Sequence, residues 1–346
     1  MTAAPPITVA LQGAGMIAMA HAASARTLGY ELVAVASRTP ERAANVAAMF
    51  GATAVAYDDL PAGADVVAIA TPPQCHAADA LRMLEAGAAV LLEKPLCRTL
   101  DEADALVAAA ARHPGRLLYA ENLAYAPVVQ RMVALAPRVG TATHLQVRSL
   151  QGLPGWGAFT TDEWGGGALF DLGVHPLSIA MLLANVVGEG RAVAVSATLR
   201  GGEGHDSDEH GDVTLHFRSG FTAHVVSSWQ AGPGPEWDAQ LAGDQGVVRA
   251  VLFPELSLEL NGDPVALPTA TSQPPVLDQF GYTGQLRALV EDAAAGREPL
   301  MSAAFGREVL QVVMAAYTSA GLGGEMVPLP FEGPRDRTPL QLWRGA

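Results

Sequence analysis

The stretch VALQGAGMIAMAHA, residues 9–22, decides the fold of the first part of this 346-residue chain. It begins with apolar residues typical of a buried strand and ends in an alanine-rich segment typical of a helix. The residues between fit the G-x-G-x-x-G/A pattern of turns that bind dinucleotides: Gly13 permits the tight turn, Gly15 lets backbone approach a pyrophosphate, and Ala18 allows close helix–strand packing. The alternative is a tight turn that binds nothing. The residues expected to contact a dinucleotide are Gly13, Gly15, Met16 and Ile17.

The first 120 residues alternate apolar runs with alanine-rich segments. The apolar runs are continuous, which is typical of parallel strands that are buried on both faces. The expected strands are Ile7–Gln12, Leu32–Ala36, Val66–Ala70, Val90–Glu93 and Leu117–Ala120, and the expected helices lie near 16–28, 40–49, 74–86 and 99–112. Strands that alternate with helices predict a doubly wound α/β domain of the Rossmann type, which we place at residues 1–122.

The pattern changes after Ala136, where strand-like runs follow one another between turns rich in glycine and proline. Such an order is typical of an antiparallel sheet. The expected strands are His144–Leu150, Ala192–Leu199, Val213–Phe217, Thr222–Ser228, Asp238–Ala242, Val247–Val251 and Leu256–Leu260, and the expected helices span about 168–186, 277–295 and 303–320. We therefore predict an α+β domain, for substrate binding and oligomerisation, over residues 123–346.

Composition and charge disfavour several classes of protein. Half of the residues are hydrophobic and 16% are charged, which fits a folded chain. The net charge of −14 disfavours nucleic-acid binding, because no basic stripe is available to neutralise phosphates. We expect no signal peptide, because the first residues include no basic region, and no membrane span. Cys75 and Cys97 lack CxxC spacing, so we expect reduced thiols and a cytoplasmic protein.

The end of the second expected strand bears on the choice between NAD and NADP. An acidic residue there would bind the adenosine ribose and favour NAD. This chain has Ser37-Arg38-Thr39 instead, and Arg38 can pair with a 2′-phosphate while the hydroxyls of its neighbours donate hydrogen bonds. The alternative is a solvated surface arginine. NADP is therefore favoured, and NAD is not excluded.

Lys94 is the only lysine among the 21 basic residues, and all of the others are arginine. A lysine that is kept in such a chain indicates a position where a planar, permanently charged guanidinium cannot replace a compact, titratable amine. Lys94 follows the expected strand Val90–Glu93, on the edge where doubly wound sheets bind ligands. Pro95 restricts the next backbone position and allows a cis peptide bond. The alternative is a solvent-facing lysine at a strand end.

Asp171 and His175 are four residues apart within an expected helix, so one helical face would carry both side chains. A carboxylate beside an imidazole orients the ring, which suits a general base for a hydroxyl proton. Pro176 would remove the helical hydrogen bond to the carbonyl of Leu172, so we expect the helix to bend or break near His175. We interpret the pair as catalytic; a structural Asp–His pair is the alternative.

Three motifs in this order, GAGMIA, the EKP of Glu93 to Pro95, and the D-x-x-x-H of Asp171 to His175, make the chain resemble the Gfo/Idh/MocA oxidoreductase family. The resemblance covers nearly the whole chain. It implies an amino-terminal Rossmann domain and a carboxyl-terminal domain whose large open sheet often forms the oligomer interface. It also implies that Lys94 and His175 lie beside the reacting carbon. The acidic residue often found after the second strand is replaced by Arg38.

The resemblance extends to further residues of the cofactor site. Thr71, Pro72 and His76 resemble the family's cofactor wall, Glu93 belongs to its EKP motif, and Asn122 matches a position near the nicotinamide. The implied reaction passes hydride between a secondary alcohol carbon and the nicotinamide. His175 would remove the hydroxyl proton with Asp171 holding its ring, and Lys94 would donate a hydrogen bond to the same oxygen.

The remaining signals discriminate less well. Trp156 and Trp164 are expected either to stack on a sugar ring or to anchor a loop, and Tyr125 either to reach substrate or to pack in the core. The acidic residues 203–212 are read as a solvated hairpin loop, with a metal site or a contact for a cationic aminosugar as alternatives, and no metal ligand is assigned.

The expected function is an NAD(P)-dependent dehydrogenase for a sugar, sugar derivative or cyclitol. A hydrolase or epimerase that retains its nicotinamide, and a regulator that senses the cofactor, are the alternatives. Lys94, Asp171 and His175 are all present, and a regulator would need no groups for proton transfer, so the regulator is disfavoured. The expected partners are a polyhydroxylated small molecule and further copies of the chain in a homodimer or homotetramer, without nucleic acid or membrane.

Overall fold

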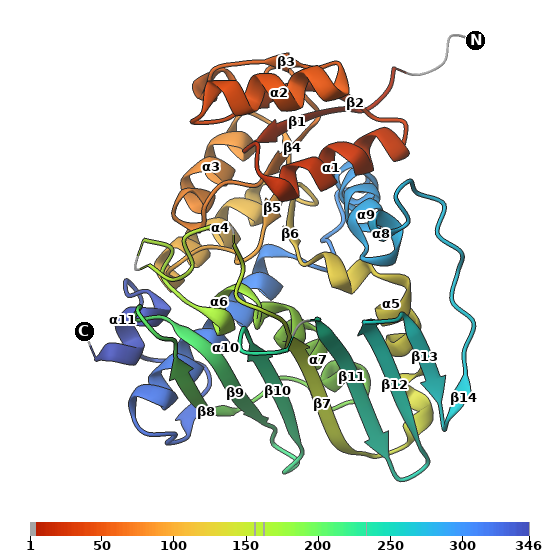
Figure 1. Cartoon of the computed structure of the whole chain (residues 1–346), viewed down its shortest axis with the longest axis vertical. Helices are drawn as coiled ribbons and strands as arrows, with labels where there is room; N and C mark the ends of the chain where they lie inside the picture. The colour runs from red at the N-terminus through yellow and green to blue at the C-terminus, as the bar shows by residue number, and fades with distance from the viewer. Residues whose placement is uncertain (1–4, 156, 162, 233, 346) are drawn as a thin grey trace. The chain divides into compact units, whose positions relative to one another are not determined.

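The computed structural model describes residues 5–155, 157–161, 163–232 and 234–345 (Figure 1). Two compact units can be distinguished within them. The first comprises the chain up to Cys97, Glu102–Ala126 and Ala270–Arg307, and the second comprises Arg98–Asp101, Pro127–Thr269 and the chain from Glu308 onward. Residues 270–307 thus belong with the amino-terminal unit although they are distant from it in sequence.

The first unit contains a six-stranded parallel sheet in the order β3-β2-β1-β4-β5-β6. The strands are β1 (Thr8–Gln12), β2 (Glu31–Ala36), β3 (Thr53–Ala54), β4 (Val66–Ile69), β5 (Ala89–Glu93) and β6 (Leu117–Ala120). Every residue of β4, β5 and β6 is buried, as expected for strands with both faces covered. The predicted doubly wound order is confirmed, and it reverses between β1 and β4.

The first four helices of the first unit follow the predicted alternation, and two more come from the segment 270–307. They are α1 (Met16–Thr27), α2 (Pro40–Phe50), α3 (Pro73–Glu85), α4 (Leu100–Arg112), α8 (Val276–Gln279) and α9 (Tyr282–Ala295), with short 3₁₀ turns at Tyr57–Asp59 and Asn122–Tyr125. The alanines Ala18, Ala22 and Ala25 of α1 are fully buried. Because their side chains are small, α1 can lie close to the sheet.

The second unit is built on a nine-stranded sheet in the order β14-β13-β12-β11-β7-β10-β9-β8-β15. Its strands are β7 (Ala142–Leu150), β8 (Ala194–Gly201), β9 (Asp208–His216), β10 (Thr222–Ser228), β11 (Glu236–Gly243), β12 (Gly246–Phe253), β13 (Ser257–Leu260), β14 (Asp263–Pro264) and β15 (Val327–Pro328). Only β7 and β10 pair in parallel, so the predicted mainly antiparallel sheet is confirmed. The register places Val195, Leu215, Ala223, Leu145 and Leu241 in one fully buried row across five strands.

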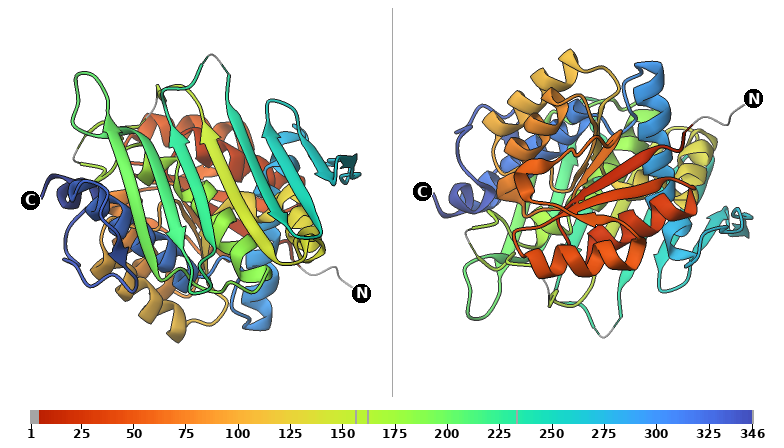
Figure 2. Two further views of the ribbon diagram at one scale, coloured as in Figure 1. Left: turned by 90° about the horizontal axis from the view of Figure 1, so that it is seen from below. Right: turned by 90° about the horizontal axis from the view of Figure 1, so that it is seen from above.

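Helices cover one face of this sheet. Those of the second unit are α5 (Pro127–Leu135), α6 (Ala168–Asp171), α7 (Val174–Val186), α11 (Pro339–Arg344) and α10 (Ala303–Gly321), which begins in the first unit; a 3₁₀ turn spans Ala136–Val139. Helix α7 packs against β7 and β10. In the left view of Figure 2, no helix of the described chain crosses the other face. None of the described helices is long and apolar enough to cross a membrane.

The break expected near His175 is present, because the segment 168–186 is divided into α6 and α7 at Leu172 and Gly173. One feature of the second unit differs from the prediction. Strand β9 begins at Asp208, five residues before the expected start at Val213. The prediction that the acidic segment is a solvated loop is therefore wrong for its last residues.

Candidate active site

The glycine turn between β1 and α1 leaves no room for a side chain at its first position. Gly13 has a φ of +114°, and a Cβ placed there would collide with the backbone carbonyl of Ala70. Only glycine adopts this conformation readily. The structure therefore contains the tight turn that the sequence predicted. This turn follows the end of β1, which pairs with the end of β4.

The second glycine, Gly15, caps the amino terminus of α1 in an extended conformation. Apart from Gly15 itself and its neighbours in sequence, no atom of the described residues lies within 4 Å of the position that a Gly15 Cβ would take. The turn borders an open hollow, also lined by Met16, Arg42 and Asn45. Free N–H groups at a helix start, an open approach and a nearby guanidinium fit a dinucleotide pyrophosphate. Sequence reasoning missed Arg42 and Asn45, which lie beyond the glycine motif on α2.

The polar segment after β2 lies between that strand and α2. Arg38 is exposed, and the Ser37 hydroxyl accepts a hydrogen bond from the backbone N–H of Thr39 at 3.2 Å. Thr39 is the N-cap residue of α2, but its side chain makes no capping hydrogen bond. Arg38 therefore has the exposure that a 2′-phosphate partner needs, and its contact with the cofactor stays a prediction. Ile17 is half-buried in the first turn of α1.

Lys94 directly follows β5, two strands from the glycine turn in the sheet order. The peptide bond between Lys94 and Pro95 is cis. The neighbouring Glu93 is buried, accepts the Lys94 backbone N–H at 3.1 Å and contacts His21 Nε2 at 2.9 Å. Burial alone would raise the pKa of Glu93, but the contact with His21 and the charge of Lys94 hold it below its ordinary value. Glu93 thereby fixes the backbone of Lys94, and its own contact with cofactor stays a prediction.

His76 on α3 joins two loops of the predicted cofactor wall. Its Nε2 lies 2.7 Å from the carbonyl oxygen of Thr71, and its Nδ1 lies 2.8 Å from that of Pro95. Burial lowers the pKa of His76, whereas the two carbonyls favour the protonated ring. Because both nitrogens face backbone oxygens, we interpret His76 as a support for the wall rather than as a direct ligand of the cofactor. Pro72 is the N-cap residue of α3.

Thr71 has a second support. Its hydroxyl donates to Asp79 Oδ2 at 3.1 Å, and the Tyr57 hydroxyl donates to the same oxygen at 2.5 Å. Burial and the Asp79 carboxylate raise the pKa of Tyr57 well above its ordinary value, so Tyr57 remains a donor. Tyr57 and Asp79 were not singled out from the sequence, where nothing distinguished them from surface residues.

Asn122 and Tyr125 lie in the 3₁₀ turn after β6, and both are buried. The Asn122 amide donates to the carbonyl of Phe280 at 2.7 Å, and the Tyr125 hydroxyl accepts the backbone N–H of Met301 at 3.4 Å. Burial raises the pKa of Tyr125. Both side chains therefore tie the turn to residues 270–307 of the same unit, and their contacts with ligands stay predictions.

In the second unit, Asp171 ends α6 and His175 lies in the first turn of α7. The break that the sequence predicted near His175 lies between these two residues, at Leu172 and Gly173, so they lie on separate helices. Pro176 is the third residue of α7, where its missing N–H costs no helical hydrogen bond. Asp171 and His175 are both buried, with exposed fractions of 5% and 6%. The His175 ring lies 5.6 Å from the indole ring of Trp237, a residue that sequence reasoning missed.

Two tryptophans were expected either to stack on a sugar ring or to anchor a loop. Trp164 packs edge-to-face against Phe159, with ring centroids 4.3 Å apart, and borders a core cluster with Trp229. Its packing favours the anchoring alternative, although substrate contact is not tested. Trp156 lies outside the described residues. Within the parts of the chain that are described, no group of three or more His, Cys, Asp or Glu side chains is arranged to hold a metal ion.

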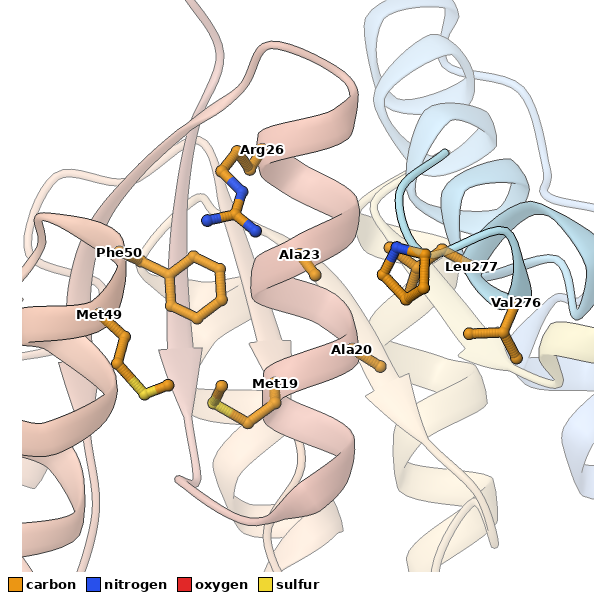
Figure 3. A pocket seen from close by; sticks show the side chains of 9 residues that line it. Met19, Ala20, Ala23, Arg26, Met49, Phe50, Val276 and Leu277 are labelled. Atoms are coloured by element: carbon orange, nitrogen blue, oxygen red, sulfur yellow. The ribbon is translucent and has the colours of Figure 1, made fainter. Parts of the chain in front are cut away.

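A further hollow in the first unit lies along α1 (Figure 3). Helix α1 lines it with Met19, Ala20 and Ala23, and Phe50 and Leu277 enter from the flanking helices. The Arg26 guanidinium covers the Phe50 ring at 5.0 Å. This lining contains no acid–base group, so the hollow is not a candidate for the chemistry.

Comparison with known proteins gives two matches to family models. The model described as "Oxidoreductase family, NAD-binding Rossmann fold" matches residues 7–121, and the model described as "GFO/IDH/MocA C-terminal domain" matches residues 129–249. A solved structure, GenD2 from gentamicin A biosynthesis in complex with NAD, is similar with a TM-score of 0.82 and 26% identity, over 94% of this chain and 97% of that one.

Two relatives are similar in sequence. Inositol 2-dehydrogenase of Rhizobium meliloti (strain 1021) is 26% identical over 326 residues, which cover 89% of this chain and 95% of that enzyme. D-glucoside 3-dehydrogenase of Escherichia coli (strain K12) is 34% identical over 188 residues, which cover 51% of this chain and 53% of that enzyme. The second match therefore spans about half of the relative's length.

Proposed function

Because the chain belongs to the Gfo/Idh/MocA family of NAD-binding oxidoreductases, we propose that it transfers hydride between a nicotinamide dinucleotide and a secondary alcohol or ketone of a sugar, sugar derivative or cyclitol. One observation carries the proposal. A glycine turn that fits a pyrophosphate and the only lysine of the chain follow strands of the same parallel sheet. The two dehydrogenases that act on inositol and D-glucosides support the substrate class.

The proposed chemistry assigns one role to each group. When bound, the nicotinamide supplies the acceptor or donor of hydride. In the oxidative direction, His175 takes the proton of the substrate hydroxyl, and Asp171 orients its ring. Lys94 donates a hydrogen bond to the same oxygen and stabilises its developing negative charge. Such general acid–base help is typically worth ~10²–10⁴-fold in rate.

A screen of sugars, glycosides and cyclitols with NAD⁺ or NADP⁺ tests the proposal. At least one of these polyols is expected to drive formation of reduced nicotinamide. The proposed substrate class would be contradicted if the cofactor binds but no polyol reduces it and no matching ketone oxidises its reduced form.

We propose NADP as the preferred cofactor, because exposed Arg38 stands where an acidic residue would bind the adenosine ribose. Replacing Arg38 with Asp exchanges a phosphate partner for a repelling carboxylate. We expect NADP affinity to fall about 10- to 100-fold, the scale of a lost charge-assisted hydrogen bond, with a much smaller effect on NAD. Calorimetric titration with both cofactors measures the difference, with the exposed Arg112 changed to Asp as control. Parallel changes for NAD and NADP would remove Arg38 from the site.

We also propose a homodimer or homotetramer that forms through the uncovered face of the nine-stranded sheet (Figure 2). The sequence resemblance and the absence of a helix from that face among the described residues support this. Sedimentation of the purified protein as a monomer would refute it.

A further inference from the structure

The acidic segment before β9 ends in a carboxylate that is fully buried. Asp208, the first residue of β9, is 0% exposed. Its Oδ1 accepts the Gly167 backbone N–H at 3.1 Å and the Tyr317 hydroxyl at 2.5 Å, and its Oδ2 accepts the Leu169 backbone N–H at 2.8 Å. Burying a charge removes its hydration, which costs on the order of several kcal/mol unless the charge is paired or hydrogen-bonded. The structure therefore supplies this group with donors from two helices.

Gly167 allows the close approach of α6 to β9. A Cβ on Gly167 would collide with the Asp208 backbone, so glycine is required for α6 to reach β9. The Gly167 N–H also faces the Tyr317 hydroxyl oxygen at 3.1 Å. Burial and the Asp208 carboxylate raise the pKa of Tyr317 well above its ordinary value, so this phenol keeps its proton and donates.

These contacts hold the residues that carry the proposed catalytic groups. The N–H groups bound by Asp208 belong to the first turn of α6, whose last residue is Asp171. The Gly167 carbonyl accepts the Asp171 N–H at 2.9 Å, so one residue links Asp208 to Asp171. The chain then turns at Gly173 and enters α7 with His175. A shift at Gly167 is therefore transmitted to Asp171 through a single helical turn.

We propose that Asp208 and Tyr317 are positioning residues that fix Asp171 and His175 for proton transfer; the inference rests on the proposed function. Neither residue needs to touch the substrate. Their effect is on geometry, and a misplacement of about 1 Å can cost ~10²-fold in rate.

Tyr317→Phe tests this inference, because it removes one hydroxyl and keeps the ring. We expect kcat to fall about 10-fold or more, within the range of a misplaced group, with cofactor affinity unchanged. The primary deuterium isotope effect should rise as the chemical step becomes slower. Hydrogen exchange at the amides of residues 167–171 should accelerate, and this readout needs no activity. Asp208→Asn, which leaves one acceptor oxygen, should show the same changes more strongly.

Ser319→Ala is the matched control on the same helix. Ser319 is also fully buried, and its hydroxyl accepts the Ala197 N–H at 2.9 Å and donates to the Glu325 carbonyl at 2.6 Å. It should cost stability without changing kcat or exchange in α6. Equal effects of Tyr317→Phe and Ser319→Ala on kcat and exchange, or none from Tyr317→Phe, would overturn the inference. An inactive wild-type protein would count against the proposed function instead, and the exchange measurement would still decide this one.

Discussion

Replacing His175 with alanine is expected to lower turnover by about 10²-fold or more, the scale of a lost general base. The dinucleotide should still bind with nearly unchanged affinity, because the glycine turn that fits it belongs to the other compact unit. Stopped-flow measurement of hydride transfer, beside a calorimetric titration of the cofactor, separates the two effects. Added imidazole should restore part of the rate, since it can replace a missing base but not a missing structural contact.

The control for this variant is Ser178→Ala, on the same helix. Ser178 is fully buried, and within the described residues its hydroxyl has no hydrogen-bond partner. Its loss should leave turnover nearly intact. If His175→Ala keeps normal turnover, the base is another group, and the proposed role of Asp171 fails with that of His175.

Replacing Lys94 with arginine should yield a folded protein that binds the dinucleotide and has lost most of its hydride transfer. A guanidinium is bulkier than an ammonium, distributes its donors over a planar fork and cannot release a proton near neutral pH. It should displace the substrate oxygen, and a displacement of about 1 Å can cost ~10²-fold in rate. Single-turnover kinetics measure the loss, and thermal unfolding verifies the fold.

The reverse exchange on the same unit, Arg112→Lys, is the control. Arg112 is exposed and donates to the carbonyl of Ala108, one turn earlier on the same helix, at 3.1 Å, so its replacement should be silent. Full activity of Lys94→Arg would show that the only lysine of the chain has no chemical role, and the proposed site would have to be moved.

The sequence was sufficient for features that depend on local pattern. Continuous apolar runs predicted the parallel strands, and the spacing from Gly13 to Ala18 predicted a turn that has no room for a side chain at Gly13. The position of Lys94 at the end of β5 also followed from pattern alone, because the strand before it is apolar throughout except for its last residue.

Features that depend on tertiary contact were missed. Asp208 lies among acidic residues and reads as part of a solvated loop, but the first turn of α6 and Tyr317, 109 residues away, bury it. The break between α6 and α7, by contrast, was expected from Pro176, and the structure has it at Leu172 and Gly173.

The most direct test of the central claim follows the transferred hydrogen. A polyol identified in the screen is prepared with deuterium on the reacting carbinol carbon and incubated with oxidised cofactor. The account predicts that the deuterium appears on the reduced nicotinamide, as mass spectrometry of the released cofactor can show. Deuterium that is lost to water, or that returns to the product while no labelled cofactor is released, would contradict a dehydrogenase and favour the hydrolase or epimerase alternative.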